Sequence, residues 1–371
     1  MKTRHIITTI LLTIPLIAGA QKITLGTCET HDGGQYNGEM EGGKPNGKGK
    51  TVFPDGNVYE GDYFKGLRHG VGVFTFFDGE RYDGAWYKDH QHGTGTYYFL
   101  NNNKYVGEWY IDVQQGHGIM YYYNGDIYDG QWENDRRHGQ GKYTFTNGAY
   151  YEGQWLNDMK SGQGKYLWPD GSSYEGEWLE NQRNGRGTFR YADGDVYVGQ
   201  WKSDLQHGKG IYKFQNGDIY EGDYLQGART GTGISKYANG DRYTGTFLDG
   251  QMSGQGTMVW QNGNTYTGQW QNDKPNGRGK LTTKQGDVVE GFFKGGQPDG
   301  ECIGHLADGS KFKAHYKNGQ RHGRCIEEDK DGKRFEGNYT EGKRDGSFVE
   351  KDRNGKVTAQ GTYTNGRRRT E

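Results

Sequence analysis

The feature that most constrains this chain is a repeat of 23 residues. An aromatic residue, a glycine two residues later and a second aromatic residue recur at Tyr82-Gly84-Trp86, and the same triplet returns with an unchanged spacing of 23 residues. Counted from its first residue, the pattern runs from Tyr36 to Phe335 without an insertion. Self-similarity at such a short period is typical of a solenoid, in which each unit packs only on its neighbours.

Each repeat also carries two glycine signals. A Gly-x-Gly follows the first aromatic residue, and an Asp-Gly or Asn-Gly dipeptide precedes the next one, as at Asp55-Gly56 and Asn262-Gly263. Such dipeptides suit type I′ turns, which require two positive φ angles and join two antiparallel strands. The sequence therefore predicts one β-hairpin per repeat, with its type I′ turn at the Asp-Gly or Asn-Gly.

The positions of the prolines provide an independent check on the register of the repeat. Pro54 and Pro169 come directly before an Asp-Gly, whereas Pro45, Pro275 and Pro298 precede the Gly-x-Gly. Because proline lacks a backbone N–H and is tolerated in turns, we expect both positions to be turns.

Alternation along the strands assigns the faces. The aromatic residues and the glycine between them point to one side of the predicted sheet, and acidic residues such as Asp83 point to the other. Aromatic residues make up 14% of the chain, although hydrophobic residues make up only 30%. One face is therefore expected to be aromatic, with glycine gaps into which neighbouring rings lean.

This 23-residue pattern resembles the MORN (membrane occupation and recognition nexus) repeat. The resemblance implies an all-β fold, an elongated and twisted single-layer antiparallel sheet of consecutive β-hairpins, with a groove along the aromatic side. From Val289 onward the units drift, with Cys302 and Cys325 where a glycine stood, and they resemble a variant MORN unit common in bacterial proteins.

The domain prediction follows the repeat. It comprises a signal peptide at 1–20, an N-terminal cap at 21–34, eleven regular repeats at 35–286, three variant repeats at 287–357, and a degenerate repeat with a basic tail at 358–371. The signal is indicated by Lys2 and Arg4, the apolar run that follows them, and the small residues before Gln21. We therefore expect an exported protein of the periplasm, outer surface or secreted fraction, and the variant units suggest a Gram-negative bacterium.

Composition and spacing narrow the functional classes. The formal net charge is -1, and -3 without Lys2 and Arg4, so no broad electrostatic attraction to nucleic acid is expected. Equivalent positions in adjacent repeats should lie about 9.6 Å apart, too far for a Cys302–Cys325 disulfide or for a metal ion shared by a histidine column. The prediction is no enzyme, no cofactor and no metal site, because the acidic residues recur as a stripe and do not converge on one point.

The aromatic face leaves two interpretations open. Its rings either pack against one another inside the sheet, or stay partly exposed and bind a partner along the groove. The favoured hypothesis is a scaffold for protein partners, with a homodimer also considered; the alternative is a glycan or a lipid headgroup at a membrane surface. The candidate groove residues are Trp86, Trp109, Trp132, Trp155, Trp178, Trp201, Tyr82, Tyr105, Tyr128 and Tyr151.

Overall fold

The computed structural model describes residues 22–369, and these residues form 31 β-strands and no helix. The described residues divide into an N-terminal unit that ends at Thr146 and a C-terminal unit that begins at Asn147. The expected signal peptide at 1–20 lies outside the described residues. Within 22–369 there is consequently no helix long and apolar enough to cross a membrane.

The N-terminal unit contains β1 (Thr24–Glu29), β2 (Gln35–Glu41), β3 (Lys44–Val52), β4 (Val58–Phe64), β5 (Leu67–Thr75), β6 (Arg81–Tyr87), β7 (His90–Tyr98), β8 (Lys104–Tyr110), β9 (Val113–Tyr121), β10 (Ile127–Glu133) and β11 (Arg136–Thr144). The C-terminal unit contains β12 (Tyr150–Leu156), β13 (Met159–Leu167), β14 (Ser173–Leu179), β15 (Gln182–Arg190), β16 (Val196–Lys202), β17 (Leu205–Lys213), β18 (Ile219–Leu225), β19 (Ala228–Lys236), β20 (Arg242–Leu248), β21 (Gln251–Val259), β22 (Thr265–Gln271), β23 (Lys274–Thr282), β24 (Val288–Lys294), β25 (Gln297–His305), β26 (Lys311–Lys317), β27 (Gln320–Glu328), β28 (Arg334–Thr340), β29 (Lys343–Lys351), β30 (Val357–Thr364) and β31 (Arg367–Arg369).

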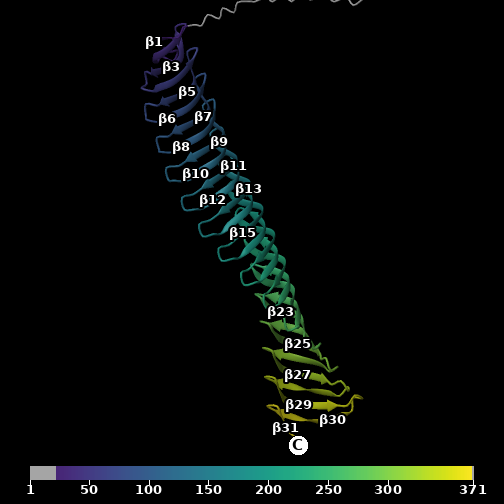
Figure 1. The fold of residues 1–371 in the computed structure, drawn as a ribbon. Coiled ribbons are helices and arrows are strands. Elements are labelled where there is room, and N and C mark those ends of the chain that lie inside the picture. The colour runs from purple at the N-terminus through teal and green to yellow at the C-terminus, as the bar shows by residue number, and fades with distance from the viewer. Residues whose placement is uncertain (1–21, 370–371) are drawn as a thin grey trace, which may run out of the picture. The chain divides into compact units, whose positions relative to one another are not determined.

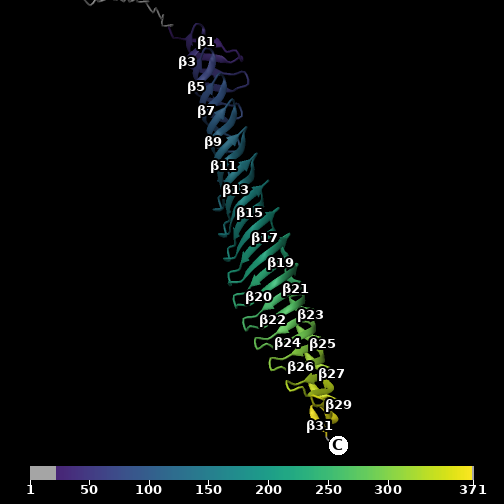
Figure 2. The ribbon, with the colours of Figure 1, turned by 90° about the vertical axis from the view of Figure 1, so that its right-hand side faces the viewer.

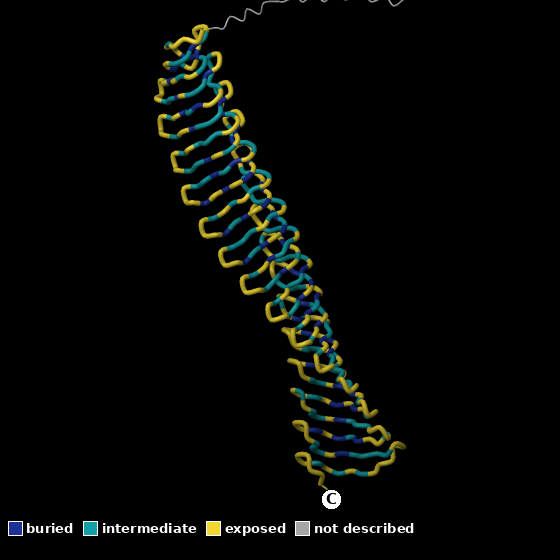
Figure 3. The backbone as a smooth tube through the Cα atoms, viewed as in Figure 1, coloured by how far each residue is buried: buried dark blue, intermediate teal, exposed yellow. Residues whose placement is uncertain are grey.

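Inside each unit, every strand pairs antiparallel with the strand that follows it in the chain. The pairing runs from β1–β2 to β10–β11 in the first unit, and from β12–β13 to β30–β31 in the second (Figures 1 and 2). Buried residues lie along the strands and exposed residues gather at the turns (Figure 3). The prediction of an antiparallel sheet of consecutive hairpins is thus confirmed within each unit.

The turn at Asp-Gly is a different type from the predicted one. In the loop Pro169-Asp170-Gly171 only Gly171 has a positive φ, at 87°, and its N–H donates to Trp168 O at 3.1 Å. Asp170 accepts the N–H of Ser172 at 2.9 Å, a local bond that favours a right-handed conformation at the aspartate. The prediction was therefore wrong: this is a three-residue loop that ends in a left-handed glycine.

The two-residue turns with two positive φ angles lie at the opposite end of each hairpin. One of them joins β12 to β13 through Asn157 and Asp158, with φ values of 48° and 69°. The sequence signal was missed because the second position here varies between glycine, as at Gly66, and Asp or Asn, as at Asp158. Asp and Asn tolerate left-handed backbone less readily than glycine does. A favourable interaction elsewhere must offset the backbone strain of the left-handed Asp or Asn.

That interaction is a hydrogen bond to the neighbouring repeat. The second residue of the turn, Asp273, accepts the backbone N–H of Met252 at 2.8 Å, and the same bond joins Gln91 to Asp112. Where the donor position is proline, as at Pro275, the turn of the next repeat carries glycine, Gly296. We call this bond the turn latch.

The prolines at the start of a strand follow this rule. Pro45, Pro275 and Pro298 lie inside β3, β23 and β25, so the expectation that they occupy turns was wrong. Each has a glycine at the matching turn position of the next repeat, and its carbonyl still accepts the N–H of that glycine at 2.8 to 3.0 Å. Proline is tolerated here because the glycine of the neighbouring turn has no side chain that would need the N–H that proline lacks.

The two glycines of Gly-x-Gly have different structural roles. The first glycine, for example Gly139 with a φ of 59°, forms a bulge in the hairpin, where the pairing register shifts between Gly130 and Trp132. The second, Gly141, faces Gly130 across the strands, and a Cβ on Gly141 would lie 2.3 Å from the Tyr128 hydroxyl oxygen. The tyrosine ring therefore lies directly over the two glycines, an arrangement that we call the glycine cradle.

Tryptophan joins neighbouring cradles. Trp132 packs edge-to-face against Tyr128 of its own hairpin and Tyr105 of the preceding one, each with ring centroids 5.3 Å apart. Its Nε1 donates to Gly118 O at 3.0 Å, while the Tyr128 hydroxyl donates to Gln131 O at 2.9 Å. The polar atoms of both Tyr128 and Trp132 are thus satisfied inside the sheet.

Cations also enter this interior, which the sequence reasoning did not anticipate. The Arg183 guanidinium lies 4.5 Å from the Trp201 ring centroid and its Nε is 2.9 Å from Asp204 Oδ1. Lys160, one repeat earlier, lies 4.5 Å from the Trp178 ring, and burial lowers the pKa of its ammonium group. The faces of the tryptophan rings replace water molecules around the Arg183 and Lys160 cations.

The variant repeats fill the cradle in another way. At Val289 the tyrosine is lost, and Cys302 occupies the space opposite Gly291 that the large ring would need. At Phe312 the pair is Ala314 and Cys325, and both are 1% exposed. All three cysteines are free thiols. In both repeats the smaller residue at the tyrosine position is matched by a larger residue in place of glycine.

The cradle predicts a steric cost for a single methyl group. We expect Gly199→Ala to destabilise the protein by about 1 to 3 kcal/mol, because its Cβ would lie 2.5 Å from the Tyr197 hydroxyl and 2.6 Å from Gly210 Cα. Urea unfolding measures the effect. The control is Val198→Ala next to it, which is 43% exposed and should stay within about 0.5 kcal/mol of the parent.

The turn latch predicts a coupling between two residues. Asp273→Gly should cost about 1 to 2 kcal/mol by leaving the Met252 N–H without its acceptor. In the double variant Met252→Pro with Asp273→Gly, which copies the native pair Pro275 and Gly296, the loss should be smaller than the sum of the two single losses. Strict additivity in chemical unfolding would contradict the latch.

The buried tyrosines predict a loss of stability at alkaline pH. Burial raises the pKa of Tyr266 to about 12, and it raises the pKa values of the other cradle tyrosines above the ordinary value of about 10. The unfolded chain therefore releases these protons first, so stability is complete below about pH 10 and falls as the pH rises through the folded pKa values. Urea midpoints at about pH 8 and about pH 11 should differ less in Tyr266→Phe than in the parent.

Candidate binding groove on the polar face

The structure places all ten candidate groove residues in the interior. The four tyrosines are 0 to 1% exposed and the six tryptophans are 4 to 6% exposed. They are Tyr82, Tyr105, Tyr128, Tyr151, Trp86, Trp109, Trp132, Trp155, Trp178 and Trp201. These rings hold successive hairpins together, as the internal-packing interpretation expected, and they do not line an open surface.

The open surface lies on the opposite, polar face. In the C-terminal unit a groove of about 1390 Å³ crosses the strands from β13 to β21. Its floor is the solvent side of the cradle glycines, where the backbone is uncovered because these positions face the tyrosine rings on the other side of the sheet. These floor residues are Gly176, Gly187, Gly199, Gly210, Gly222, Gly233 and Gly245.

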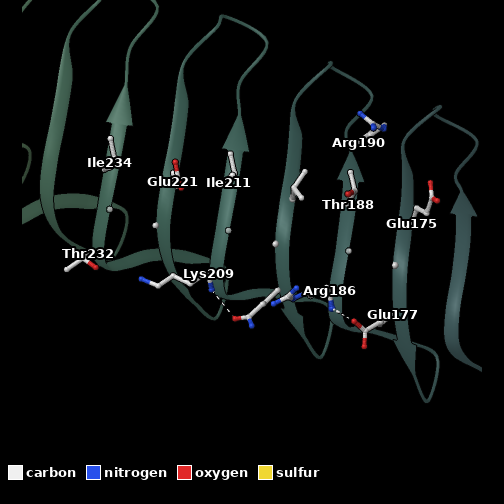
Figure 4. Close-up of a pocket in the computed structure, with 18 of the residues that line it drawn as sticks. Glu175, Glu177, Arg186, Thr188, Arg190, Lys209, Ile211, Glu221, Thr232 and Ile234 are labelled. Carbon is white, nitrogen blue, oxygen red and sulfur yellow. Dashed lines mark hydrogen bonds between the residues drawn. The ribbon is translucent and has the colours of Figure 1, made fainter.

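The two walls of this groove differ in chemistry. One wall is largely β-branched, with Glu175 and Glu221 interspersed, and the other is polar and charged (Figure 4). The first wall consists of Ser173, Glu175, Thr188, Arg190, Val198, Ile211, Glu221, Ile234 and Thr244, and the second of Gln163, Glu177, Arg186, Gln200, Lys209, Thr232, Thr246 and Gln255. An elongated ligand would thus meet a strip of apolar methyl groups beside a strip of hydrogen-bonding groups.

Local hydrogen bonds hold the polar wall in place. The side chain of Glu177 accepts the N–H of Arg186 at 2.8 Å, and that of Gln200 accepts the N–H of Lys209 at 3.0 Å (Figure 4). Lys209 pairs with Asp223 at 2.6 Å, and this contact lowers the pKa of the Asp223 carboxyl. The backbone bond at the bulge therefore fixes the direction in which each wall residue points.

The same geometry recurs in the N-terminal unit on a smaller scale. A groove of about 520 Å³ has Gly38, Gly49, Gly61 and Gly72 on its floor, with Lys48 and Glu60 among its other residues. Recurrence in both units shows that the groove is a product of the repeat itself, and that the wall residues of each repeat set its chemistry.

The sequence reasoning missed these residues for a clear reason. It assigned the positions beside the glycines to a solvated stripe, which is correct for their direction but does not reveal that the backbone between the two rows of side chains forms the floor of a groove. The signal that could have found the groove is the change along the stripe from charged residues to Val198, Ile211 and Ile234. Among residues 22–369, no group of three or more His, Cys, Asp or Glu side chains is placed to hold a metal ion.

The fold and groove define a class: an all-β repeat protein of similar hairpins with an open surface along one face. The MORN repeat family model matches thirteen consecutive segments, and the chain belongs to this family. The segments are 36–58, 59–81, 82–104, 105–127, 128–150, 151–173, 174–196, 197–219, 220–242, 243–265, 266–288, 290–311 and 312–334.

The chain shows distant similarity to solved structures. The chain is similar to the E1021V mutant of the TCP10 domain of Danio rerio CPAP at 14% identity, covering 72% of this chain and 99% of that chain, with a TM-score of 0.21. It is also similar to a streptogramin B lyase at 16% identity, covering 72% and 90%, with a TM-score of 0.14. No curated protein matches this sequence.

Proposed function

We propose that this protein is an exported, non-enzymatic MORN-repeat scaffold that binds a protein partner along the polar-face groove. The observation that carries the proposal is the groove of about 1390 Å³ with one β-branched and one charged wall. The signal-like composition of residues 1–20 supports export.

The dimensions of the groove favour a polypeptide over a small molecule. Its volume exceeds the roughly 300 to 1,000 Å³ that is common for small-molecule sites. Nine successive strands at a spacing of about 4.8 Å give a length of about 40 Å, enough for a helix of about 25 residues. Such a ligand can bury apolar area against Ile211 and Ile234 while the opposite wall selects it by hydrogen bonds and charge.

The proposal predicts a specific loss of binding when the apolar wall is charged. Ile211→Glu with Ile234→Glu should reduce recovery of the partner at least about tenfold, because each carboxylate would be buried against apolar surface in the complex. The measurement is crosslinking of the tagged full chain in the native cell envelope, followed by mass spectrometry and quantitative pull-down.

A matched control uses the same repeat position outside the groove. Ile303 and Ile326 occupy the positions equivalent to Ile211 and Ile234 in later hairpins, and neither lines the groove. The variant Ile303→Glu with Ile326→Glu should bind the partner like the parent. The parent, the groove variant and this control should all show the same circular dichroism spectrum of a β-protein. Equal partner recovery from the groove variant would reject the groove, and a signal confined to a glycan or liposome array would favour the alternative ligand class.

A further inference from the structure

A second surface lies at the two-residue-turn end of the N-terminal unit. Phe64, Tyr87 and Tyr110 occupy the same position in three consecutive hairpins and are 50%, 45% and 57% exposed. His69 lies between the first two rings, with centroid distances of 5.7 and 5.3 Å, and His92 lies between the last two, at 5.5 and 5.4 Å. We call these five side chains the aromatic row.

The aromatic row has a fixed period. Its three exposed rings are one hairpin apart, about 9.6 Å for two strand spacings. The histidine contacts place each pair of rings no more than 11.0 Å apart, since the two centroid distances on either side of His69 set that limit. A ligand that contacts all three rings must therefore present equivalent groups at nearly this interval.

A polyproline II helix meets this requirement best among regular polypeptide conformations. It advances about 9.3 Å per turn of three residues, so every third residue returns to the same side, and over two intervals it departs from the row by less than about 1 Å. Residues seven apart in an α-helix are about 10.5 Å apart and run ahead by about 2 Å over the row. A β-strand places residues three apart on opposite faces.

Charge adds a second restriction on the ligand. The ammonium groups of Lys65 and Lys88 lie 5.1 and 5.0 Å from the rings of Phe64 and Tyr87, and neither lysine has an ion-pair partner among residues 22–369. At the same hairpin position the row is bounded by Glu41 on one side and Glu133 on the other. Acidic residues between the prolines of a ligand would complement the lysines, and the row has room for three prolines.

We infer that the aromatic row binds a proline-rich, acidic segment of a partner protein, of the pattern Pro-x-x-Pro-x-x-Pro with Asp or Glu at an x position. Exposed aromatic rings recognise the preformed polyproline II helix at a low entropic cost, because that helix is already ordered before binding. This site is independent of the groove in the C-terminal unit. The groove variant Ile211→Glu with Ile234→Glu should leave it unchanged.

The test is a titration of the full chain with two synthetic peptides of equal composition, monitored by calorimetry. The first is Pro-Glu-Ala-Pro-Glu-Ala-Pro, and the second, Pro-Glu-Pro-Ala-Pro-Glu-Ala, has its prolines at alternate positions. We expect the first peptide to bind at least about tenfold more tightly, and Tyr87→Ala to weaken it by about tenfold. A third peptide, with Gln in place of each Glu of the first, should bind the parent more weakly than the first peptide does. Lys88→Glu should abolish this difference in affinity.

Because the substituted side chains are exposed, the variants should keep the fold and report on binding. Tyr123→Ala is the control, since Tyr123 is 76% exposed at the other turn of the same unit and should bind the first peptide like the parent. Circular dichroism checks that each variant keeps its β-structure. Equal affinity for the two peptides, an unchanged affinity in Tyr87→Ala, or binding only to a β-linked oligosaccharide would overturn the inference.

Discussion

The contact of a tyrosine ring with two facing glycines is the constraint on which the rest of the structure depends. A ring such as Tyr151 covers Gly153 and Gly164, and the approach is so close that a methyl group on either glycine would overlap it. A single sheet has no second layer to cover its apolar side, so the rings must cover it themselves. The cradle allows this because each ring lies flat against the backbone of its own hairpin and supports the tryptophan of the next one.

The cradle also explains why glycine is so abundant without making the chain disordered. One glycine of each Gly-x-Gly supplies left-handed backbone for the bulge, and the other supplies space under the ring. Where the tyrosine is replaced, as at Val289 and Phe312, Cys302 and Cys325 stand in place of that second glycine. The variant repeats therefore solve the same packing problem with a different division of volume.

Bonds between neighbouring repeats turn a set of hairpins into a continuous structure. The turn latch crosses from one hairpin to the next through Asp or Asn, and it disappears together with its donor wherever proline takes that position. The same pairing occurs at the other turn: Gln261 donates its N–H to Asp241, whereas Pro169 stands opposite Ala149, which has no acceptor. The residues of the groove walls and of the aromatic row can therefore vary between repeats, because the glycine cradle and the turn latch use other positions.

The sequence by itself determined the period, the antiparallel hairpins, the family, and the division into an aromatic and a polar face. These follow from local rules, since the spacing of Tyr82, Gly84 and Trp86 repeats without interruption and alternation fixes the faces. Only the tertiary structure decided which turn is which, because a bond from Met252 to Asp273 joins residues in different repeats. It also decided that Trp132 is buried and that Ile211 lines a groove, because exposure depends on how closely neighbouring hairpins approach, and that distance is not a property of any one repeat.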